Sequence, residues 1–405
     1  MKILEDYRGI VSDDVIADLH RRASRLLGKR IVHMNSTAYG GGVAEILYSL
    51  VPLMNDAGLQ AGWRVLVGDS DFFNVTKSFH NGVQGNEIDL TDEMKDLYLK
   101  TNEAFSQYTH IGSHDAVIIH DPQPLPIIRY YRKVQPWVWR CHIDLSNPDP
   151  GLWEYLKGFI LRYDLVVISH ESYRRPDLPV EQRIVHPAID PLGHKNCDLS
   201  DQTIARALAR FKIPADKPIV TQVSRFDRFK DPAGVVEVFK RVRERVDCRL
   251  VLAGNMATDD PEGADVLAET KMAAGGLAES GDVIFILGAK DTEINALQRV
   301  SSVVMQKSVR EGFGLTVSEA MWKGTPVVAG AVGGIPLQVS DGTGGFLVDP
   351  RDHDGAADRV AYLLENPAEA KEIGRLGKEH VRENFLTTRL LGHWLAIMEE
   401  LISER

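Results

Sequence analysis

Short apolar segments alternate with longer amphipathic segments along most of the 405-residue chain. Short apolar runs rich in Val and Ile are typical of buried strands, and the segments between them carry the spacing of helices. A strand–helix–strand rhythm predicts parallel sheets with helices on both faces. The predicted strands are residues 30–35, 63–68, 116–120, 137–142, 165–169, 183–187, 219–224, 249–254, 283–288, 303–306, 326–330 and 345–348.

The rhythm is interrupted at residues 186–194, H-P-A-I-D-P-L-G-H, whose prolines and glycine are typical of a linker. A chain of this length exceeds what one hydrophobic core usually serves. We therefore predict two doubly wound α/β domains in tandem, residues 1–190 and 191–380, followed by a final helical segment. Ligands of open parallel sheets bind beyond the carboxyl ends of the strands, so two such domains facing each other would place a ligand in the cleft between them.

The charge and the cysteines argue against several classes of partner. Lys and Arg number 47 against 57 Asp and Glu, and the net charge of −10 gives no support to nucleic-acid binding. Cys141, Cys197 and Cys248 are far apart, odd in number and without metal-ligand spacing, so we expect reduced thiols in a cytoplasmic protein. The first residues include acids where a secretory signal needs an apolar run, and no segment has transmembrane length, so we expect no membrane partner.

The segment R-E-G-F-G-L-T-V-S-E-A, residues 310–320, follows a predicted strand and opens a predicted helix near Leu315. Its glycines allow the backbone to approach a ligand closely, and the first N–H groups of the helix form an anion site. Glu311 would project toward the ligand and accept hydrogen bonds from sugar hydroxyls. Glu319, about one turn into the helix, could hold the hydroxyls of a ribose. Taken alone, Glu319 could also be a first-turn acid that the helix dipole favours.

Arg225 and Lys230 follow the predicted strand 219–224 and precede a helix that starts near Pro232. Two cations at the carboxyl end of a strand can hold a diphosphate. The same residues would also fit a solvated loop, and this pair alone does not decide between the two interpretations.

In the first half of the chain, Gly40–Gly42 follow the first predicted strand and lead into a helix. Such a turn can receive a phosphate or a sugar, although a plain flexible turn has the same sequence, and the pattern is not the G-x-G-x-x-G of dinucleotide sites. Residues 120–124, H-D-P-Q-P, and 140–146, R-C-H-I-D-L-S, follow two further strands and carry polar side chains. His142 alone would more often be a packed or capping histidine, but its position at a strand end favours a functional role.

Together these residues resemble the retaining glycosyltransferases of family four, which have the GT-B fold of two Rossmann-like domains. The E-x7-E motif of that family matches Glu311 and Glu319. Its Arg/Lys diphosphate pair matches Arg225 and Lys230, and its N-terminal glycine loop matches Gly41–Gly42. The segments G-G-G-V-A-E, H-D-P-Q-P, W-R-C-H-I-D and H-P-A-I-D-P-L look like those of the trehalose glycosyltransferring synthases. The resemblance covers nearly the whole chain.

The resemblance implies a retaining transfer of glucose from a nucleoside-diphosphate glucose (UDP-, ADP- or GDP-glucose) to free glucose, which gives α,α-trehalose. It implies front-face attack with a donor phosphate oxygen as the base, so that Glu311 positions the sugar and no protein nucleophile is needed. Arg225 and Lys230 would neutralise the leaving diphosphate, and His142 would orient the donor sugar and stabilise its oxocarbenium-like state. His142, Arg225, Lys230 and Glu311 are the implied catalytic residues. The implied donor-binding residues are Gly41, Gly42, Arg225, Lys230, Leu287, Glu311, Gly312, Phe313, Gly314, Leu315, Thr316 and Glu319. The implied acceptor-binding residues are Gly41, Gln123, His142 and Asp144.

The same resemblance extends to cofactors and assembly. No cofactor is required, and any Mg²⁺ would be bound through the donor diphosphate. Dimers are common among similar enzymes, so a homodimer is compatible with the sequence. The last helix, within residues 381–405, would cross back onto the first domain, and its apolar residues recur at the spacing of a packed helix face. These residues are Leu390, Leu391, Trp394, Leu395, Met398 and Leu401.

Three alternatives stay open. A retaining trehalose phosphorylase would use inorganic phosphate in place of the nucleotide, which would leave Glu319 without a ribose. A family-four transferase with a phosphosugar acceptor would need further cations in the first domain, where Arg129, Arg132 and Lys133 lie in a solvated helical pattern. A sugar-nucleotide-binding sensor would not need the complete set of charge-stabilising groups. The sequence does not decide the nucleotide base, the direction of the reaction or the oligomeric state.

Overall fold

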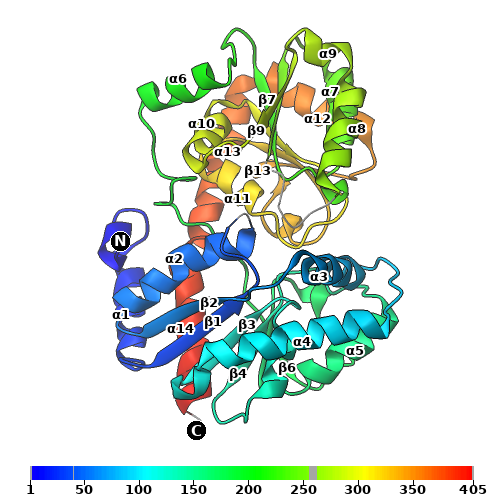
Figure 1. Ribbon diagram of the computed structural model, residues 1–405. Coiled ribbons are helices and arrows are strands. Elements are labelled where there is room, and N and C mark those ends of the chain that lie inside the picture. The colour runs from blue at the N-terminus through cyan, green and yellow to red at the C-terminus, as the bar shows by residue number, and fades with distance from the viewer. Residues whose placement is uncertain (1, 40, 255–261, 404–405) are drawn as a thin grey trace. The chain divides into compact units, whose positions relative to one another are not determined.

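The structure, a computed structural model, describes residues 2–39, 41–254 and 262–403, so Gly40 of the predicted glycine loop lies outside the described residues. The chain forms two compact units (Figure 1). The first unit comprises Met1–Ala188 and Thr387–Arg405, and the second comprises Ile189–Leu386. Each unit is built on one sheet of parallel strands, which confirms the predicted α/β fold class.

The sheet of the first unit has six strands in the order β2-β1-β3-β4-β5-β6. The order reverses between β1 and β3, and ligands of open parallel sheets bind at such a switch point, beyond the carboxyl ends of the strands. The register places His33 opposite Ile118 and His120 opposite Arg140. The strands are β1 (Arg30–Asn35), β2 (Gln60–Val65), β3 (Ala116–His120), β4 (Trp137–Arg140), β5 (Leu165–Ile168) and β6 (Glu181–Ile184).

Three helices of the first unit, α3, α4 and α5, begin where short polar side chains cap them. Asp69, Thr91 and Asp149 each accept a hydrogen bond from a backbone N–H in the first turn of the following helix. The α-helices are α1 (Asp13–Ser24), α2 (Gly42–Asp56), α3 (Ser70–Val83), α4 (Asp92–Thr109), α5 (Pro150–Ile160) and α14 (Thr387–Ser403). The 3₁₀ helices are η1 (Leu4–Tyr7), η2 (Ile111–Ser113), η3 (Leu125–Tyr130) and η4 (Glu171–Tyr173).

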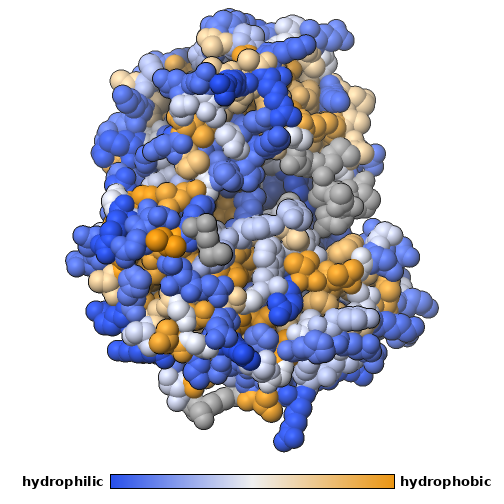
Figure 2. All heavy atoms as spheres, turned by 60° about the vertical axis from the view of Figure 1, so that its left-hand side comes forward, coloured by the Kyte–Doolittle hydropathy of each residue, from blue (hydrophilic) through white to orange (hydrophobic). Residues whose placement is uncertain are grey.

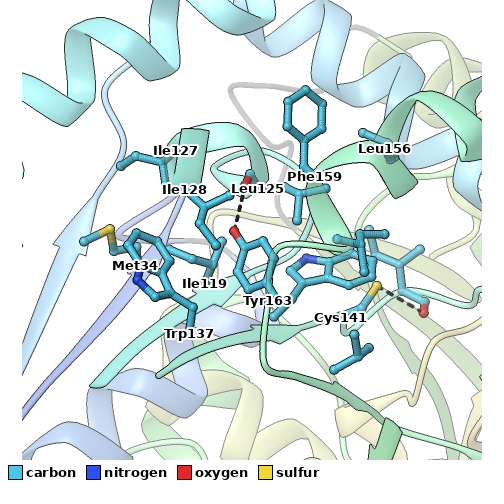
Figure 3. Close-up of a cluster of buried hydrophobic side chains, with 14 of the residues drawn as sticks. Met34, Ile119, Leu125, Ile127, Ile128, Trp137, Cys141, Leu156, Phe159 and Tyr163 are labelled. Atoms are coloured by element: carbon cyan, nitrogen blue, oxygen red, sulfur yellow. Dashed lines mark hydrogen bonds between the residues drawn. The ribbon is translucent and has the colours of Figure 1, made fainter. Parts of the chain in front are cut away.

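Large aromatic and aliphatic side chains fill the core of the first unit (Figure 3). Trp137 and Ile119 from the sheet pack in one cluster with side chains of α5 and η3. The hydroxyl of Tyr163 donates a hydrogen bond to the carbonyl of Leu125 at 2.6 Å, so this buried polar atom is satisfied. The last helix, α14, packs against α1 and α2. As its spacing predicted, it buries Leu390, Leu391, Trp394, Leu395 and Met398, whereas Leu401 is half-buried.

The sheet of the second unit has the order β12-β13-β11-β10-β7-β8-β9. Apart from the short edge strand β12, this is the Rossmann order, with β7 and β10 on the two sides of the switch point. The strands are β7 (Ile219–Val223), β8 (Arg249–Gly254), β9 (Val283–Leu287), β10 (Val303–Gln306), β11 (Val327–Gly330), β12 (Ser340–Asp341) and β13 (Gly344–Val348). The helices are α6 (Asp201–Arg210), η5 (Arg228–Lys230), α7 (Pro232–Arg243), α8 (Gly263–Ala274), α9 (Gly276–Glu279), α10 (Asp291–Val300), α11 (Leu315–Trp322), η6 (Ile335–Leu337), α12 (His353–Glu365) and α13 (Pro367–Asn384).

The strands that differ most from the prediction lie at sheet edges. The strands predicted at 63–68 and 183–187 are β2 and β6, and they begin three and two residues earlier than predicted. Both are edge strands of the first sheet, where polar residues such as Gln60 and Glu181 are tolerated because one side of the strand lacks a neighbour. Their true start therefore carries no apolar signal. The edge strand β12 was missed for the same reason.

Hydrophilic residues predominate on the molecular face in Figure 2, with apolar residues in scattered groups. Within the described ranges, no helix is both long enough and apolar enough to span a membrane.

Candidate active site

The predicted diphosphate residues of the second unit lie at its switch point, just beyond β7. Asp227 accepts a hydrogen bond from the N–H of Phe229 at 2.7 Å and starts η5, the helical turn that carries Lys230. Asp231 has a φ of 48° and caps α7 through the N–H of Gly234 at 3.1 Å. Gln222, from β7 itself, donates to the carbonyl of Lys230 at 2.8 Å. Hydrogen bonds thus hold the backbone in place on both sides of Lys230.

The structure brings Lys230 and Glu311 together, from loops beyond neighbouring strands. The Nζ of Lys230 lies 2.5 Å from Oε2 of Glu311. The same oxygen accepts hydrogen bonds from Nε2 of Gln306 at 3.3 Å and from Oγ of Ser308 at 3.2 Å. The Glu311 side chain is 10% exposed and that of Lys230 is 18% exposed. A carboxylate that three donors hold in place is suited to orienting a ligand.

The glycine turn between Glu311 and α11 needs its glycines. Gly314 has a φ of 83°, and a Cβ built there would lie 3.2 Å from Cγ of Glu311. A Cβ on Gly334 would lie 2.8 Å from the carbonyl oxygen of Gly312. Larger residues at these positions would therefore displace the turn from the first residues of α11, Leu315 and Thr316.

Phe313 differs from its neighbours in this turn. Its side chain is buried, packs edge-on against Phe385 with ring centroids 5.5 Å apart, and so is not presented as a ligand-binding group. Its carbonyl accepts a hydrogen bond from Nε2 of Gln338. Phe313 therefore anchors the turn from beneath, and only its backbone could meet a ligand.

Glu319, the predicted ribose ligand, is 3% exposed. Its Oε1 lies 3.8 Å from Nζ of Lys195, a residue that no sequence motif indicates. Lys323 donates to the backbone carbonyl of Glu319 at 2.9 Å and to Oδ1 of Asn196 at 2.8 Å. Burial lowers the pKa of Lys323 to about 7. Lys195 and Lys323 thus join the segment after the linker to the helix that carries Glu319.

Arg225 and Leu287 are the more exposed members of the predicted donor site. The Arg225 side chain is 37% exposed, and its Nη2 lies 3.7 Å from Oδ2 of Asp227, which is a long ion pair. Leu287 ends β9 with 46% of its surface exposed, and Gly288 follows it with a φ of 70°.

Lys307 is a residue of this region that the sequence analysis missed. Its side chain is 1% exposed, and its Nζ contacts Oδ2 of Asp231 and the carbonyl of Pro350. Gln306 and Ser308, on either side of it, both contact Glu311, so side chains alternate along this segment. This alternation with a period of two was the sequence signal by which Lys307 could have been recognised. Lys307 braces the residue that follows Lys230.

In the first unit, three histidines form one hydrogen-bonded chain. Nδ1 of His33 lies 3.0 Å from Nε2 of His120, and Nδ1 of His120 lies 2.9 Å from Nε2 of His142. They come from β1, the end of β3 and the residue two beyond β4, which are neighbours in the sheet. His33 is fully buried and His120 nearly so, whereas His142 is partly exposed. Only His142 had been predicted as a site residue by itself.

Asp121 orients the last histidine of the chain. Its Oδ1 accepts a hydrogen bond from the backbone N–H of His142 at 2.7 Å, and its carbonyl accepts one from Nε1 of Trp139 at 3.0 Å. Asp121 has a φ of 61°, a conformation that Asp and Asn tolerate better than most residues. Burial raises the pKa of Asp121 to about 7, against the opposing effects of the His142 N–H and of Arg140.

A small cavity lies beside His142 and His120 and is also lined by the buried Arg140. Arg140 donates to Oγ of Ser169 at 3.0 Å and to the carbonyl of Val185 at 2.8 Å. Burial lowers the pKa of Arg140 to about 10, so the guanidinium stays charged at neutral pH. The apolar residues of the lining are Ile46, Leu50, Pro187, Leu390 and Trp394.

The other predicted acceptor residues of the first unit do not line this cavity. Oε1 of Gln123 is buried and has no hydrogen-bond partner among the described residues. Asp144 accepts the N–H of Ser146 at 2.8 Å through Oδ1. Gly41 is the N-cap of α2 and Gly42 is its first residue, as the glycine loop predicted.

The described residues contain no group of three or more His, Cys, Asp or Glu side chains that could hold a metal ion. The second unit offers cations, amides, the clamped carboxylate of Glu311 and backbone N–H groups, and the first unit offers the imidazoles. Such a set can neutralise phosphate charge and bind the hydroxyls of a sugar.

Comparison with known proteins gives the family. Residues 33–175 match the family described as "Trehalose synthase, N-terminal domain", and residues 204–380 match "Glycosyl transferases group 1". A trehalose synthase from Pyrococcus horikoshii is 46% identical over 401 residues, which are 98% of this chain and 96% of that protein. A trehalose phosphorylase from Pleurotus pulmonarius is 29% identical, and the match covers 97% of this chain but 60% of that protein.

A solved structure of sucrose-phosphate synthase from Thermosynechococcus elongatus matches the chain with a TM-score of 0.75 at 20% identity. The match covers 93% of this chain and 100% of that one, and it confirms the predicted GT-B fold. Identity at the level of the Pyrococcus protein, over nearly the full length of both chains, settles the family. The chain belongs to the trehalose synthase family, and it is a glycosyltransferase.

Proposed function

We propose that the protein transfers the glucosyl group of a nucleoside-diphosphate glucose to free glucose and so makes α,α-trehalose. The observation that carries this proposal is the cluster of Lys230, Gln306 and Ser308 around the carboxylate of Glu311, at the switch point of a Rossmann sheet. A carboxylate held beside a cation suits a donor that carries both sugar hydroxyls and phosphates.

The second unit would bind the donor. Arg225 and Lys230 would meet the diphosphate, together with the first N–H groups of α11 at Leu315 and Thr316. Glu311 would accept hydrogen bonds from the sugar hydroxyls. The nucleotide base would lie near Leu287.

Glu319 would hold the ribose, with Lys195 keeping its carboxylate in place. Glu319 is 3% exposed, so its carboxylate is held in a fixed position for the ribose hydroxyls. A ribose ligand gives this carboxylate a role that inorganic phosphate would not, and so the cluster supports a nucleotide sugar as the co-substrate.

The first unit would bind glucose through Gly41, Gln123, His142 and Asp144. Gln123 is partly exposed, and a side-chain amide has both donors and an acceptor for sugar hydroxyls.

The cations of the first unit argue against a phosphosugar acceptor. The expected helical pattern around Arg129 is limited to η3, and Arg132 and Lys133 follow it in a loop. Arg129 and Arg132 are exposed, and Lys133 is paired with Asp164 at 2.7 Å. None of the three lies in a loop for which ligand binding is predicted.

In the proposed reaction the bond between C1 of the donor glucose and the phosphate oxygen breaks, and a bond from C1 to O1 of the acceptor glucose forms on the same face. The acceptor hydroxyl gives its proton to a phosphate oxygen of the departing nucleoside diphosphate. Arg225 and Lys230 stabilise the charge that develops on that group. Glu311 already accepts three hydrogen bonds, so we assign it to positioning and not to nucleophilic attack. No protein-bound cofactor is required, and Mg²⁺ would be carried by the diphosphate.

The phosphorylase is the second candidate. The lower identity and the 60% coverage of the Pleurotus enzyme favour the synthase. A sensor without turnover is disfavoured by the clamped Lys230–Glu311 pair. We further propose a cytoplasmic location, which the free thiols of the described chain support, and leave a homodimer to measurement by light scattering.

The test is to incubate the purified protein with glucose and UDP-, ADP- or GDP-glucose and to identify the product by NMR. A symmetric α,α-1,1 disaccharide is expected, and the best donor names the base. Trehalose consumption that occurs only with added phosphate, and no product from any nucleotide sugar, would instead identify a phosphorylase.

A further inference from the structure

We propose that His33 and His120, two buried histidines that no prediction had selected, are positioning residues that fix the ring plane and the tautomer of His142. The inference rests on the role proposed above for His142. It goes beyond that role because neither buried histidine is expected to touch a substrate.

The geometry links the three rings through defined nitrogens. His120 uses both of its ring nitrogens, Nε2 toward His33 at 3.0 Å and Nδ1 toward His142 at 2.9 Å. The rings of His120 and His142 are stacked, with centroids 5.2 Å apart. The ring of Trp394 packs edge-on against that of His33, with the ring centroids 5.8 Å apart. The chain therefore has a fixed start in the core and ends at the partly exposed His142.

Each of the two contacts requires one N–H and one lone pair, because a neutral imidazole has one donor and one acceptor nitrogen. If His142 carries its proton on Nε2, it donates to His120, which must then donate from its own Nε2 to His33. If His142 carries its proton on Nδ1, the whole chain reverses. In both cases all three histidines have the same tautomer, and the outward nitrogen of His142 acts only as a donor or only as an acceptor.

The surroundings keep the three histidines neutral. Burial lowers the pKa of His33 to about 3, and burial together with neighbouring groups lowers the pKa of His120 and of His142 well below the usual value. The charged groups described nearby are Arg140 and Asp121. The elements packed against the cavity beside the chain contribute the apolar side chains Ile46, Leu50, Pro187, Leu390 and Trp394. A protonated imidazole is thus disfavoured at all three positions, and each histidine stays in one neutral tautomer.

The chain gives His142 a definite role toward a sugar hydroxyl. A histidine free to switch tautomer would accept or donate with equal ease. His142 is instead restricted to one role, and its ring cannot rotate without breaking the contact to His120. At metal sites, outer-shell groups that orient a histidine ligand typically change affinity or activity by about 10–100-fold when they are removed, and we take the same scale for His142.

The first test is kinetic and uses a matched pair at His33. His33→Leu removes the contact to His120, whereas the amide of His33→Asn can donate or accept near the former Nδ1 position. We expect His33→Leu to lower kcat about 10–100-fold with the KM for the donor changed less than about threefold. His33→Asn should recover most of that loss. Equal kcat values for the two variants would overturn the proposal.

A double-mutant cycle separates positioning from a structural role. If His33 acts through His142, then His33→Leu should have no further effect on kcat in the His142→Ala background. Additive losses would overturn the inference. His114→Leu is the control, since His114 is half-buried in the same unit, hydrogen-bonded to the carbonyl of Ile111, and lies before the amino end of β3. Normal turnover in His142→Ala would refute the role of His142 and this inference together, while leaving the trehalose product assay unaffected.

The second test needs no folded variant of the buried histidines. Long-range ¹H–¹⁵N correlation spectra of the parent protein, labelled with ¹⁵N-histidine, report the tautomer of each ring. One shared neutral tautomer at all three positions from pH 6 to 8 is the expected result. Mixed tautomers, or an imidazolium at His142 in that range, would refute the proposal whatever the activity of any variant.

Discussion

Lys307→Met is the perturbation that most directly tests how the donor site is held. The substitution keeps the apolar stem of the side chain and removes the ammonium group that contacts Asp231 and the carbonyl of Pro350. Removing one partner of a buried ion pair usually costs about 3–5 kcal/mol, because the other charge is left without its partner. Asp231 is 26% exposed and keeps its hydrogen bond from the N–H of Gly234, so water can replace part of the lost contact. We therefore expect a loss of about 2–3 kcal/mol.

For a unit of this size the loss corresponds to a fall in Tm of about 5–10 °C, which differential scanning calorimetry resolves. Lys240→Met is the matched control. Lys240 pairs with Glu237 at 2.7 Å, but both side chains are about 40% exposed, so its Tm should stay within about 1–2 °C of the parent. Asp231→Asn keeps the cap of α7 and leaves Lys307 unpaired, so it should also destabilise the protein.

The combined Lys307→Met/Asp231→Asn variant should lose less stability than the sum of the two single losses, because neither charge is then left alone. If Lys307→Met melts within 1 °C of the parent, or if the two losses add, the ion pair does not brace this segment. The KM for the donor should rise in Lys307→Met, since Asp231 directly follows Lys230.

Three further predictions concern the two sites. Arg225→Ala should lower kcat by about 10²–10³-fold with little change in Tm, because Arg225 is partly exposed and its ion pair is long; near-normal turnover would remove it from the diphosphate site. Gly314→Ala should lower both Tm and kcat, because the strained φ adds to crowding against Glu311. The control is Gly281→Ala, which has a φ of 76° and no described atom within 4 Å of the added Cβ, and it should lower Tm alone. Equal kcat values for the two variants would contradict this prediction. Asp121 has its pKa raised to about 7, so the folded protein holds a proton that the unfolded chain releases, and stability falls as the pH rises from about 4 to 7. Asp121→Asn should therefore raise Tm relative to the parent more at pH 8 than at pH 5, and equal shifts at both pH values would refute the assignment.

Much of the fold was predictable because central strands of parallel sheets are buried on both faces. Their apolar runs, such as 116–120 and 249–254, mark the strands to the residue. Edge strands carry both polar and apolar residues, and so the predicted starts of β2 and β6 were two to three residues late and β12 was missed. The difference is physical: the edge of a sheet has one neighbour and tolerates water.

The candidate site was partly predictable for a related reason. Glu311, Lys230 and the glycine turn were selected because charged residues and glycines beyond a strand end indicate a ligand site in this fold class. Lys307 and Lys195 were not, because the buried Lys307 and the partly exposed Lys195 look like any surface lysine in sequence, and the alternation around Lys307 was the one sequence signal. Phe313 was included with its neighbours as part of the turn, and its side chain is buried under that turn.

The sequence by itself determined which residue types follow each strand, and therefore the chemistry that the chain can perform. It could not determine which strands are neighbours, because periodicity is local and the order of strands is decided by packing. Only the tertiary structure placed β7 beside β10, and so Lys230 against Glu311 across 81 positions of sequence. In the same way, only the adjacency of β1, β3 and β4 turned three dispersed histidines into one hydrogen-bonded chain.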